Sequence, residues 1–279
     1  VWLRPGVFDG QWPRARHLAD ALTGHDVLVL SEVFRRSVTE FLLTKLAEHY
    51  PYQTRIVGDD PAHGPLQING GVIIVSRYPI VSEDHQTFGD LSRGPDAWSA
   101  KGVAYACIDK LGQRYHVFGS HTQSDPEPLY RAAYSFVGRD AQIQYRRLRA
   151  AQFDRIKKMI ESKRIPDCEP VIVAGDLNTD RLGCPDEFAE MLDRIDVSFP
   201  RVAEDATSTF TPTQNPLCGE GRDQWLDYVL WSRSHLAPER CLLEVVQPKA
   251  KDGWQRHPWG QRYEDLSDHY AVRCRMTFP

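Results

Sequence analysis

The side chains of this 279-residue chain that could do chemistry share one position: each lies at the end of a short apolar run. They are Glu32, His121, Asp176, Asn178, Asp227, Asp268 and His269. Any one of them has an ordinary explanation, because strand-end carboxylates are commonly solvated and a Ser-Asp-His run can be a plain turn. If the runs are neighbouring strands, however, all these groups converge on one edge of the sheets, which is far less frequent by chance.

Residues 171–178, VIVAGDLN, show the pattern in its clearest form. The first four are apolar and mostly β-branched, which predicts a strand buried on both faces. Gly175 tolerates a backbone conformation or a close approach that other residues resist. Asp176 and Asn178 are two residues apart, so in extended backbone both point to the same side. A carboxylate and a carboxamide there suit a hard cation or a phosphate, although Asp and Asn also form Asx-type turns.

Together these residue types predict metal-assisted cleavage of a phosphodiester. Glu32 and the Asp176/Asn178 pair offer oxygen ligands for Mg²⁺, which accepts one or two carboxylates together with water and phosphate. His269 has a side chain suited to removing a proton from water near neutral pH. Asp227 could hold its other ring nitrogen, as a carboxylate does for a triad histidine.

His121, together with Asn178, could stabilise negative charge on the phosphoryl oxygens in the transition state. The candidate catalytic residues are therefore His269, His121, Asp227, Asp176, Asn178 and Asp268. The candidate metal ligands are Glu32, Asp176, Asn178 and His269.

The elements that must position these groups alternate between strands and helices. Helical spacing of apolar residues predicts helices over residues 13–22, 141–165 and 185–195, with another after Ser37. Strands are predicted at residues 27–30, 56–57, 70–76, 101–109, 114–121, 171–174, 226–231, 241–246 and 270–276. The pattern favours an α/β fold in which two β-sheets form a sandwich flanked by helices, with residues 1–279 as a single catalytic domain.

Composition excludes some functions. No apolar run approaches the roughly 20 residues that span a bilayer. The net charge is -4, which argues against a protein that holds nucleic acid mainly through a basic face. The chain starts at Val1 without a signal peptide, which we expect to have been removed. Among six cysteines, Cys184 and Cys218 lie in Pro/Gly-rich loops and could form a disulfide, while Cys274 is expected to face the core.

These motifs, in this order, resemble the endonuclease/exonuclease/phosphatase superfamily, whose fold is that of pancreatic deoxyribonuclease. The stretches that carry the resemblance are residues 31–34 (SEVF), 119–123 (GSHTQ), 175–178 (GDLN), 226–228 (LDY) and 267–269 (SDH). Residues 70–80, 94–102 (GPDAWSAKG) and 246–249 (VQPK) narrow it to bacterial secreted neutral sphingomyelinases. The resemblance covers nearly the whole chain.

The resemblance implies a DNase I-like four-layer sandwich and Mg²⁺-dependent hydrolysis of sphingomyelin to ceramide and phosphocholine. By residue match, it makes Glu32 a ligand of the essential metal and His269 the general base. It places Asp176, Asn178 and His121 around the phosphate. It also implies a secreted protein, with a sphingomyelin-containing membrane surface as partner, no nucleic acid, and a monomeric state.

The family further carries an aromatic hairpin that enters the membrane, between the QPK and SDH stretches. That segment here holds Trp254 and Trp259, for which we expect membrane contact. Alternatively, one or both tryptophans pack back on the body of the protein. The segment also carries Arg256 and Arg262, so it is more polar than a deeply inserting device.

The sequence departs from the family pattern at three points. The family's first-strand Asn ligand would directly precede Val1, where the sequence does not reach. Asn69 stands where an acidic partner of His121 is expected. The family's short disulfide has no cysteines at matching positions. No general acid is identified.

Two other functions remain open. A nuclease or a phosphoinositide phosphatase could use the same scaffold, although the acidic net charge and the Trp-bearing loop argue against it. A membrane-binding module with a decayed site is the non-enzymatic alternative, and the retention of Glu32, Asp176, Asn178 and His269 argues against that.

Overall fold

The computed structural model describes residues 10–59, 68–125, 138–219, 221–256 and 259–279. The helices are α1 (Gln11–Ala21), α2 (Arg36–Leu46), the 3₁₀ helix η2 (Gly94–Trp98), α4 (Gly138–Ser162) and α5 (Pro185–Ile195). The first strands are β1 (Val27–Leu30), β2 (Tyr52–Gln53), β3 (Ile68–Asn69), β4 (Ile73–Ser76), β5 (Ile80–Thr87), β6 (Ser99–Ala100), β7 (Gly102–Lys110) and β8 (Gln113–His121). The remaining strands are β9 (Val171–Asp176), β10 (Val197–Ser198), β11 (Arg201–Val202), β12 (Asp227–Ser232), β13 (Arg240–Val246), β14 (Lys249–Gln255), β15 (Arg262–Asp265) and β16 (Ala271–Thr277).

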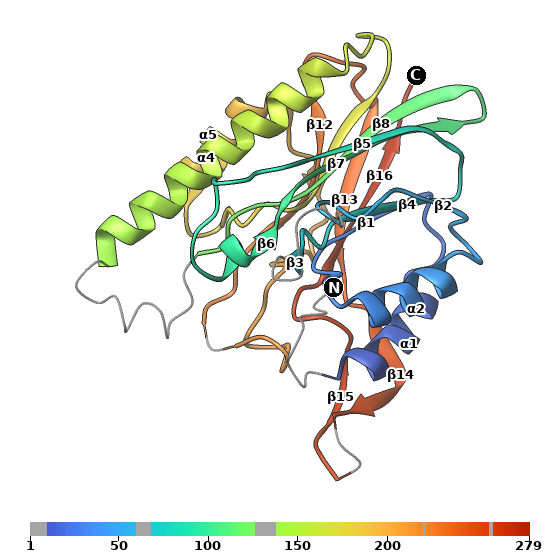
Figure 1. Cartoon of the computed structure of the whole chain (residues 1–279), viewed down its shortest axis with the longest axis vertical. Coiled ribbons are helices and arrows are strands. Elements are labelled where there is room, and N and C mark those ends of the chain that lie inside the picture. Colours follow the sequence, from blue (N-terminus) through green and yellow to red (C-terminus); the bar gives the residue numbers. More distant parts are fainter. Residues whose placement is uncertain (1–9, 60–67, 126–137, 220, 257–258) are drawn as a thin grey trace.

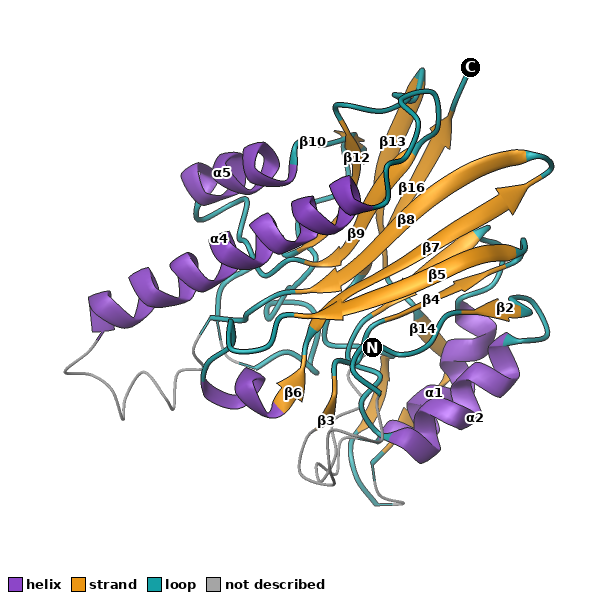
Figure 2. Cartoon of the chain, turned by 45° about the horizontal axis from the view of Figure 1, so that its top comes forward, coloured by secondary structure: helices purple, strands orange, loops and turns teal. Residues whose placement is uncertain are grey.

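Two layers of β-sheet lie between two layers of helix (Figures 1 and 2). One layer is a six-stranded sheet in the order β10-β12-β9-β8-β7-β5. The facing layer contains two three-stranded sheets, β1-β4-β2 and β11-β13-β16. Helices α4 and α5 cover the outer face of the large sheet, while α1 and α2 cover the β1-β4-β2 sheet (Figure 2). The predicted sandwich of two sheets flanked by helices is confirmed.

Three apolar cores hold the layers together. Phe153, Ile156, Met159 and Ile160 on α4 pack on Phe118 and its neighbours in the large sheet. Between the sheets, Ile74 of β4 packs against Ala104 and Ala106 of β7. Leu18 and Leu42 bring α1 and α2 onto Leu30, Ile73 and Val75.

The long helix α4 has a topological role as well as a packing one. It joins β8 to β9, which are parallel neighbours in the large sheet, and parallel neighbours require such a crossover. Both strands therefore end at the same edge. No helix in the described part of the chain is long and apolar enough to cross a membrane.

Candidate active site at the end of the large sheet

Strand register places three of the predicted side chains side by side. His121 on β8 is the parallel partner of Asp176 on β9. Asp227, at the start of antiparallel β12, is the partner of Asp176 on its other side. These residues thus occupy the same level of three adjacent strands, although they are far apart in the sequence. The convergence predicted from strand ends is confirmed for them.

The last part of β9 depends on a glycine, Gly175, which lies directly beside β8. Gly175 has a φ of 137°, and a Cβ there would lie 2.0 Å from the Ser120 carbonyl oxygen of β8. Any other residue would push these strands apart, because such a contact is shorter than real Cβ atoms show. Asn178 follows with a φ of 48°, and its N–H donates to Asp176 Oδ1 at 3.0 Å. The Asx-type turn and the functional role are therefore compatible.

His269 reaches this edge from the loop before β16. Its Nδ1 lies 2.8 Å from Asp227 Oδ2, as predicted for a carboxylate that fixes the tautomer. With Nδ1–H bonded to Asp227, Nε2 is the basic atom. Ligand atoms of Asp176, Asp227 and His269 all lie within 4.8 Å of one another.

Thr209 ties the two segments that carry Asp227 and His269 together. This fully buried hydroxyl accepts the Leu226 N–H at 2.9 Å and the Asp227 N–H at 3.2 Å. Its carbonyl accepts the N–H of Tyr270 at 2.7 Å. Thr209, which belongs to neither segment, therefore helps to set the distance between the Asp227 carboxylate and the His269 imidazole.

The loop that follows Thr209 supports the same segment. Asn215 Nδ2 donates to the Ser267 carbonyl at 2.8 Å, and the Cys218 thiol donates to the Asp268 carbonyl at 2.9 Å. The Phe210 ring meets the His269 ring edge-on, with centroids 5.2 Å apart. The loop after Thr209 therefore helps to position the imidazole.

A buried lysine was missed by the sequence reasoning. Lys101 is 2% exposed, and its ammonium lies 2.9 Å from Asp96 Oδ2 and 2.9 Å from His121 Nε2. It also donates to the Thr122 carbonyl at 3.0 Å. An ammonium has only donors, so His121 Nε2 must accept, which places the ring proton on Nδ1. The sequence did offer one indication that Lys101 is buried: it directly precedes an apolar strand, where a solvated side chain is not expected.

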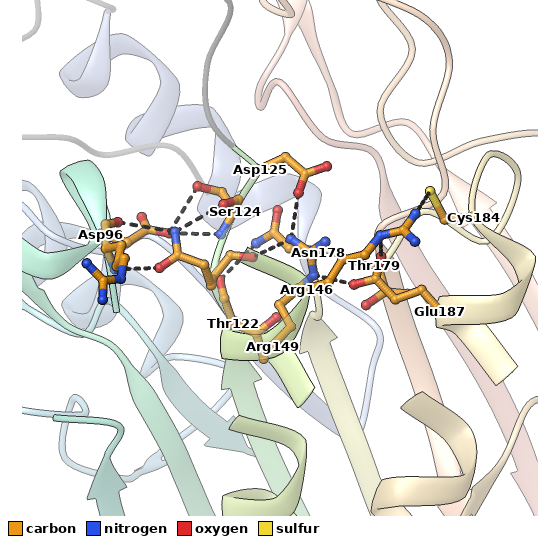
Figure 3. Close-up of polar contacts among 12 residues, drawn as sticks. Asp96, Thr122, Ser124, Asp125, Arg146, Arg149, Asn178, Thr179, Cys184 and Glu187 are labelled. Atoms are coloured by element: carbon orange, nitrogen blue, oxygen red, sulfur yellow. Dashed lines mark hydrogen bonds and ion pairs between the residues drawn. The ribbon is translucent and has the colours of Figure 1, made fainter. Parts of the chain in front are cut away.

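The carboxylate Asp96 and the segment after His121 are braced by helices α4 and α5 (Figure 3). Asp96 Oδ2 accepts from the Ser124 N–H at 2.8 Å and from Gln123 Nε2 at 2.9 Å. Arg149 of α4, buried in the interior, contacts Asp125 at 2.8 Å and Glu187 of α5 at 2.6 Å. The strand-end geometry is therefore anchored to the helical layer.

Crowded carboxylates change the proton affinities at the site. Burial and the neighbouring Asp227 raise the pKa of Asp176 to about 7, against the opposing effect of His269 and Lys101. Burial alone would lower the pKa of His269, but Asp227, Asp176 and Asp268 outweigh it and raise that pKa to about 10. The carboxylates of Asp176 and Asp227 therefore favour a positive charge between them. A proton on His269 supplies that charge here, and a bound divalent cation would supply it as well.

The donor set fits a hard cation. Carboxylate oxygens of Asp176 and Asp227 lie beside an imidazole, and oxygen ligands with some nitrogen suit Mg²⁺ and similar ions. Asn178 Nδ2 donates to the Thr122 carbonyl at 3.0 Å, which leaves its amide oxygen unused by that bond. Asp227 is engaged by His269 through Oδ2, so its first role is to orient the ring.

Glu32 and Asp268 are predicted site residues that lie outside the group of Asp176, Asp227 and His269. Glu32 follows β1 in the facing sheet with a φ of 61°, and it is not among the residues that converge within 4.8 Å. Asp268 accepts a bond from the Ser267 hydroxyl at 3.3 Å and is also outside the group. Asn69, at the position where a partner of His121 is expected, accepts the Gly71 N–H at 2.9 Å. Lys101 and Asp176 lie beside His121 Nε2, at 2.9 Å and 3.5 Å.

The two predicted membrane tryptophans have opposite environments. Trp254 is 4% exposed, stacks on Tyr263 and donates Nε1–H to the Asp265 carbonyl, so its predicted membrane contact is not supported. Trp259 is 97% exposed. The Cys184–Cys218 disulfide that the sequence left open is not formed: both thiols are free, Cys184 accepts from Arg146, and Cys218 donates to the Asp268 carbonyl. Cys274 packs against the first core as predicted.

Comparisons with known proteins identify the family to which the chain belongs. The sequence model of the Endonuclease/Exonuclease/phosphatase family matches residues 11–269. Sphingomyelinase C of Listeria ivanovii is 32% identical over 94% of this chain and 79% of that protein. Phospholipase C of Staphylococcus aureus is 32% identical over 95% of this chain and 81% of that protein.

Solved structures of related proteins have the same fold as this chain. A beta toxin mutant from Staphylococcus aureus with bound magnesium ions has a TM-score of 0.82 and 30% identity, covering 95% of this chain and 92% of that one. Sphingomyelinase C from Streptomyces griseocarneus has a TM-score of 0.81 and 32% identity, covering 96% of this chain and 92% of that one.

Proposed function

The chain belongs to the endonuclease/exonuclease/phosphatase family, and on that premise we propose that it is a Mg²⁺-dependent phosphodiesterase that hydrolyses sphingomyelin to ceramide and phosphocholine. The observation that carries the proposal is the meeting of Asp176, Asp227 and His269 within 4.8 Å at one sheet edge. Relatives named sphingomyelinase C supply the substrate class. We propose residues 1–279 as one catalytic domain, because the family match spans most of them.

His269 is proposed as the general base. Asp227 holds Nδ1. Without metal, burial is outweighed by the surrounding carboxylates, which raise the pKa of His269 to about 10. Their charge must therefore be offset, as by a bound cation, before a neutral Nε2 can remove a proton from the attacking water as the oxygen approaches phosphorus. The electron pair of the bond between phosphorus and the ceramide oxygen leaves with that oxygen. Asp227 then stabilises the imidazolium that forms, as in other acid–imidazole pairs.

His121 and Asn178 are proposed to contact the phosphoryl oxygens. The Lys101 ammonium holds His121 from the Nε2 side, so a donor on the opposite side of the ring can face the substrate. Asn178 is fixed through Thr122 and Asp176. Hydrogen-bond donors that are already oriented cost no reorganisation when negative charge develops.

Asp176 and Asn178 are the proposed metal ligands in the large sheet, with Glu32 from the facing strand as the family match implies. His269 was also a predicted ligand, but Asp227 holds its Nδ1 and its Nε2 is assigned to the attacking water, so no ring nitrogen is left for a metal. When bound, Mg²⁺ supplies charge neutralisation of the phosphoryl oxygens. The pKa of Asp176, raised to about 7 by burial and by Asp227, means that a cation competes there with a proton.

We propose a membrane surface that contains sphingomyelin as the partner, a secreted location, and a monomer without nucleic acid. The exposed Trp259 supports contact with a bilayer interface, where tryptophan is favoured. Asp268 is proposed only to add negative charge near His269.

Phosphocholine release from sphingomyelin vesicles, with Mg²⁺ and with EDTA, tests the proposal. We expect turnover with Mg²⁺, none with EDTA, and recovery when Mg²⁺ is restored. Plasmid DNA and a phosphoinositide are assayed in parallel. Cleavage of either one with sphingomyelin left intact would replace the proposed substrate.

A further inference from the structure

A second concave surface lies beside the β14–β15 hairpin, and no step proposed above uses it. It is a pocket of about 350 Å³ between α1 and β14. Pro13, Arg16 and His17 of α1 form one side, and Gln255 and Arg256 form the other. The hairpin and α1 lie next to each other at the lower end of the molecule in Figure 1.

The polar groups of this pocket are basic or amide donors. Arg16 and Arg256 are exposed, and neither forms an ion pair with another described residue. None of the described residues that line the pocket is acidic. The chain has a net charge of -4, so this basic concentration runs against its overall charge. Such a surface attracts an anion and repels a cation.

The floor and walls of the pocket are fixed by the core. Trp254 forms the floor, is buried, and stacks on Tyr263 with ring centroids 4.9 Å apart. The Arg256 guanidinium lies over the Tyr263 ring, 5.3 Å from its centroid. A guanidinium held over an aromatic face keeps its N–H edge free for an anion. Arg256 is therefore partly preorganised.

The pocket also lies close to the exposed tryptophan. Trp259 is 97% exposed and is three residues from Arg256. Three residues of fully extended chain span at most about 11 Å, so Arg256 stays within that distance of Trp259. Tryptophan settles at the headgroup level of a bilayer. If Trp259 does so, the pocket faces the headgroup region.

We propose that this pocket binds the headgroup phosphate of a net-anionic phospholipid and so fixes the protein on the membrane beside its substrate. The proposal rests on the proposed function only in placing the hairpin at a membrane. A phosphate diester accepts the forked N–H bonds that arginine donates. A zwitterionic phosphocholine would bring its ammonium among the same arginines, which is why a net-anionic lipid is preferred.

The test is binding of the purified chain to vesicles that contain no sphingomyelin, so it does not depend on turnover. Phosphatidylcholine vesicles with and without phosphatidylglycerol are compared by co-sedimentation at low salt. We expect phosphatidylglycerol to strengthen binding, and the double variant Arg16→Glu/Arg256→Glu to weaken it at least about tenfold. Turnover of a water-soluble phosphocholine diester is expected to stay unchanged.

Two control variants separate a site from general electrostatics. Arg114→Glu/Arg240→Glu makes the same change in net charge on exposed arginines of other strands, and we expect less than about a twofold effect. Arg16→Lys/Arg256→Lys keeps the charge but removes the forks, and we expect about a threefold loss.

Three results would overturn the proposal. The first is equal weakening by both double charge reversals. The second is full binding by the lysine variant, because a diffuse field would then explain the preference. The third is saturable binding of inorganic phosphate without preference for phosphatidylglycerol vesicles, which would assign the pocket to a soluble anion.

Discussion

The edge of the large sheet and the β14–β15 hairpin use polar and aromatic side chains in opposite ways. At the edge, His269, Asp227 and His121 are each held by a neighbour within about 3 Å, and Lys101 is buried beside them. In the hairpin, Trp254 is buried and anchors the base of the hairpin, while Trp259 is almost fully exposed.

The difference follows from what each region must do. Proton transfer needs groups fixed to within a fraction of an ångström, and this requires burial and several partners for each group. Contact with a fluid bilayer needs only an exposed aromatic side chain on a hairpin whose base packs firmly against the protein. The site region should therefore be intolerant of substitution, whereas the hairpin tip should tolerate it except on membranes.

The largest effect is expected at the imidazole. His269→Gln should lower turnover by about 10³–10⁴-fold, because the general base is lost while a residue of similar size keeps the packing. Turnover of sphingomyelin in vesicles and turnover of a water-soluble phosphocholine diester should fall equally. Binding of the protein to vesicles should not change. If binding fell with turnover, the two regions would not be separate.

The next effect is expected at the buried ammonium. Lys101→Met leaves Asp96 without its cation and releases His121, so we expect roughly 3 kcal/mol of destabilisation and about a 10²-fold lower kcat. Urea unfolding and steady-state kinetics measure both.

The matched control for this prediction is Lys110→Met. Lys110 pairs with Asp26 at 2.7 Å on the surface, and such pairs contribute less than about 1 kcal/mol. Equal destabilisation by the two variants would contradict the importance assigned to the buried contact.

A smaller and more selective effect is expected at the hairpin. Trp259→Ala should lower turnover on vesicles by about tenfold and leave the free energy of unfolding within about 0.5 kcal/mol. Trp254→Ala should instead cost about 3–5 kcal/mol, because it empties a buried site. Thermal unfolding and vesicle assays distinguish them, and an unstable Trp259 variant would refute the contrast.

The smallest expected effect is the pH dependence of stability without metal. The pKa of Asp176 is raised from 3.8 to about 7, and that of His269 from 6.5 to about 10. Both groups then bind protons more tightly in the folded than in the unfolded protein, so stability is lost as pH rises through these windows. In EDTA, Tm should fall by several degrees between about pH 4 and 10.

The Asp227→Asn variant serves as the control for the pH profile. It removes the carboxylate that keeps the proton on His269, so the decline above pH 6.5 should become shallower. A wild-type profile that is flat in EDTA would show that the charges at the edge are not coupled as described.

The sequence predicted the groups whose positions follow from strand periodicity. Asp176 and His121 end apolar runs and Asp227 opens one, and pairing in one sheet then places them at one level. Thr209 and Lys101 were missed because their roles depend on contacts between distant segments. Thr209 in particular stands in a stretch of threonines and prolines with no periodicity.

The tryptophans show the other limit of sequence reasoning. Trp254 pairs across the hairpin with Tyr263, and both rings face α1 because that helix presents apolar residues such as Leu18. Local sequence alone does not distinguish this residue from Trp259. Similarly, Cys184 and Cys218 looked alike in their loops, yet each has its own polar partner.

The order in which the site residues appear along the chain has a consequence for biosynthesis. His121 and Asp176 meet only after α4 has crossed over and paired β8 with β9. The imidazole that completes the set comes ten residues before the end of the sequence, at His269. A nascent chain that has not reached His269 therefore lacks the proposed proton acceptor, so the proposed hydrolysis requires that this residue has been synthesised and has docked beside Asp227.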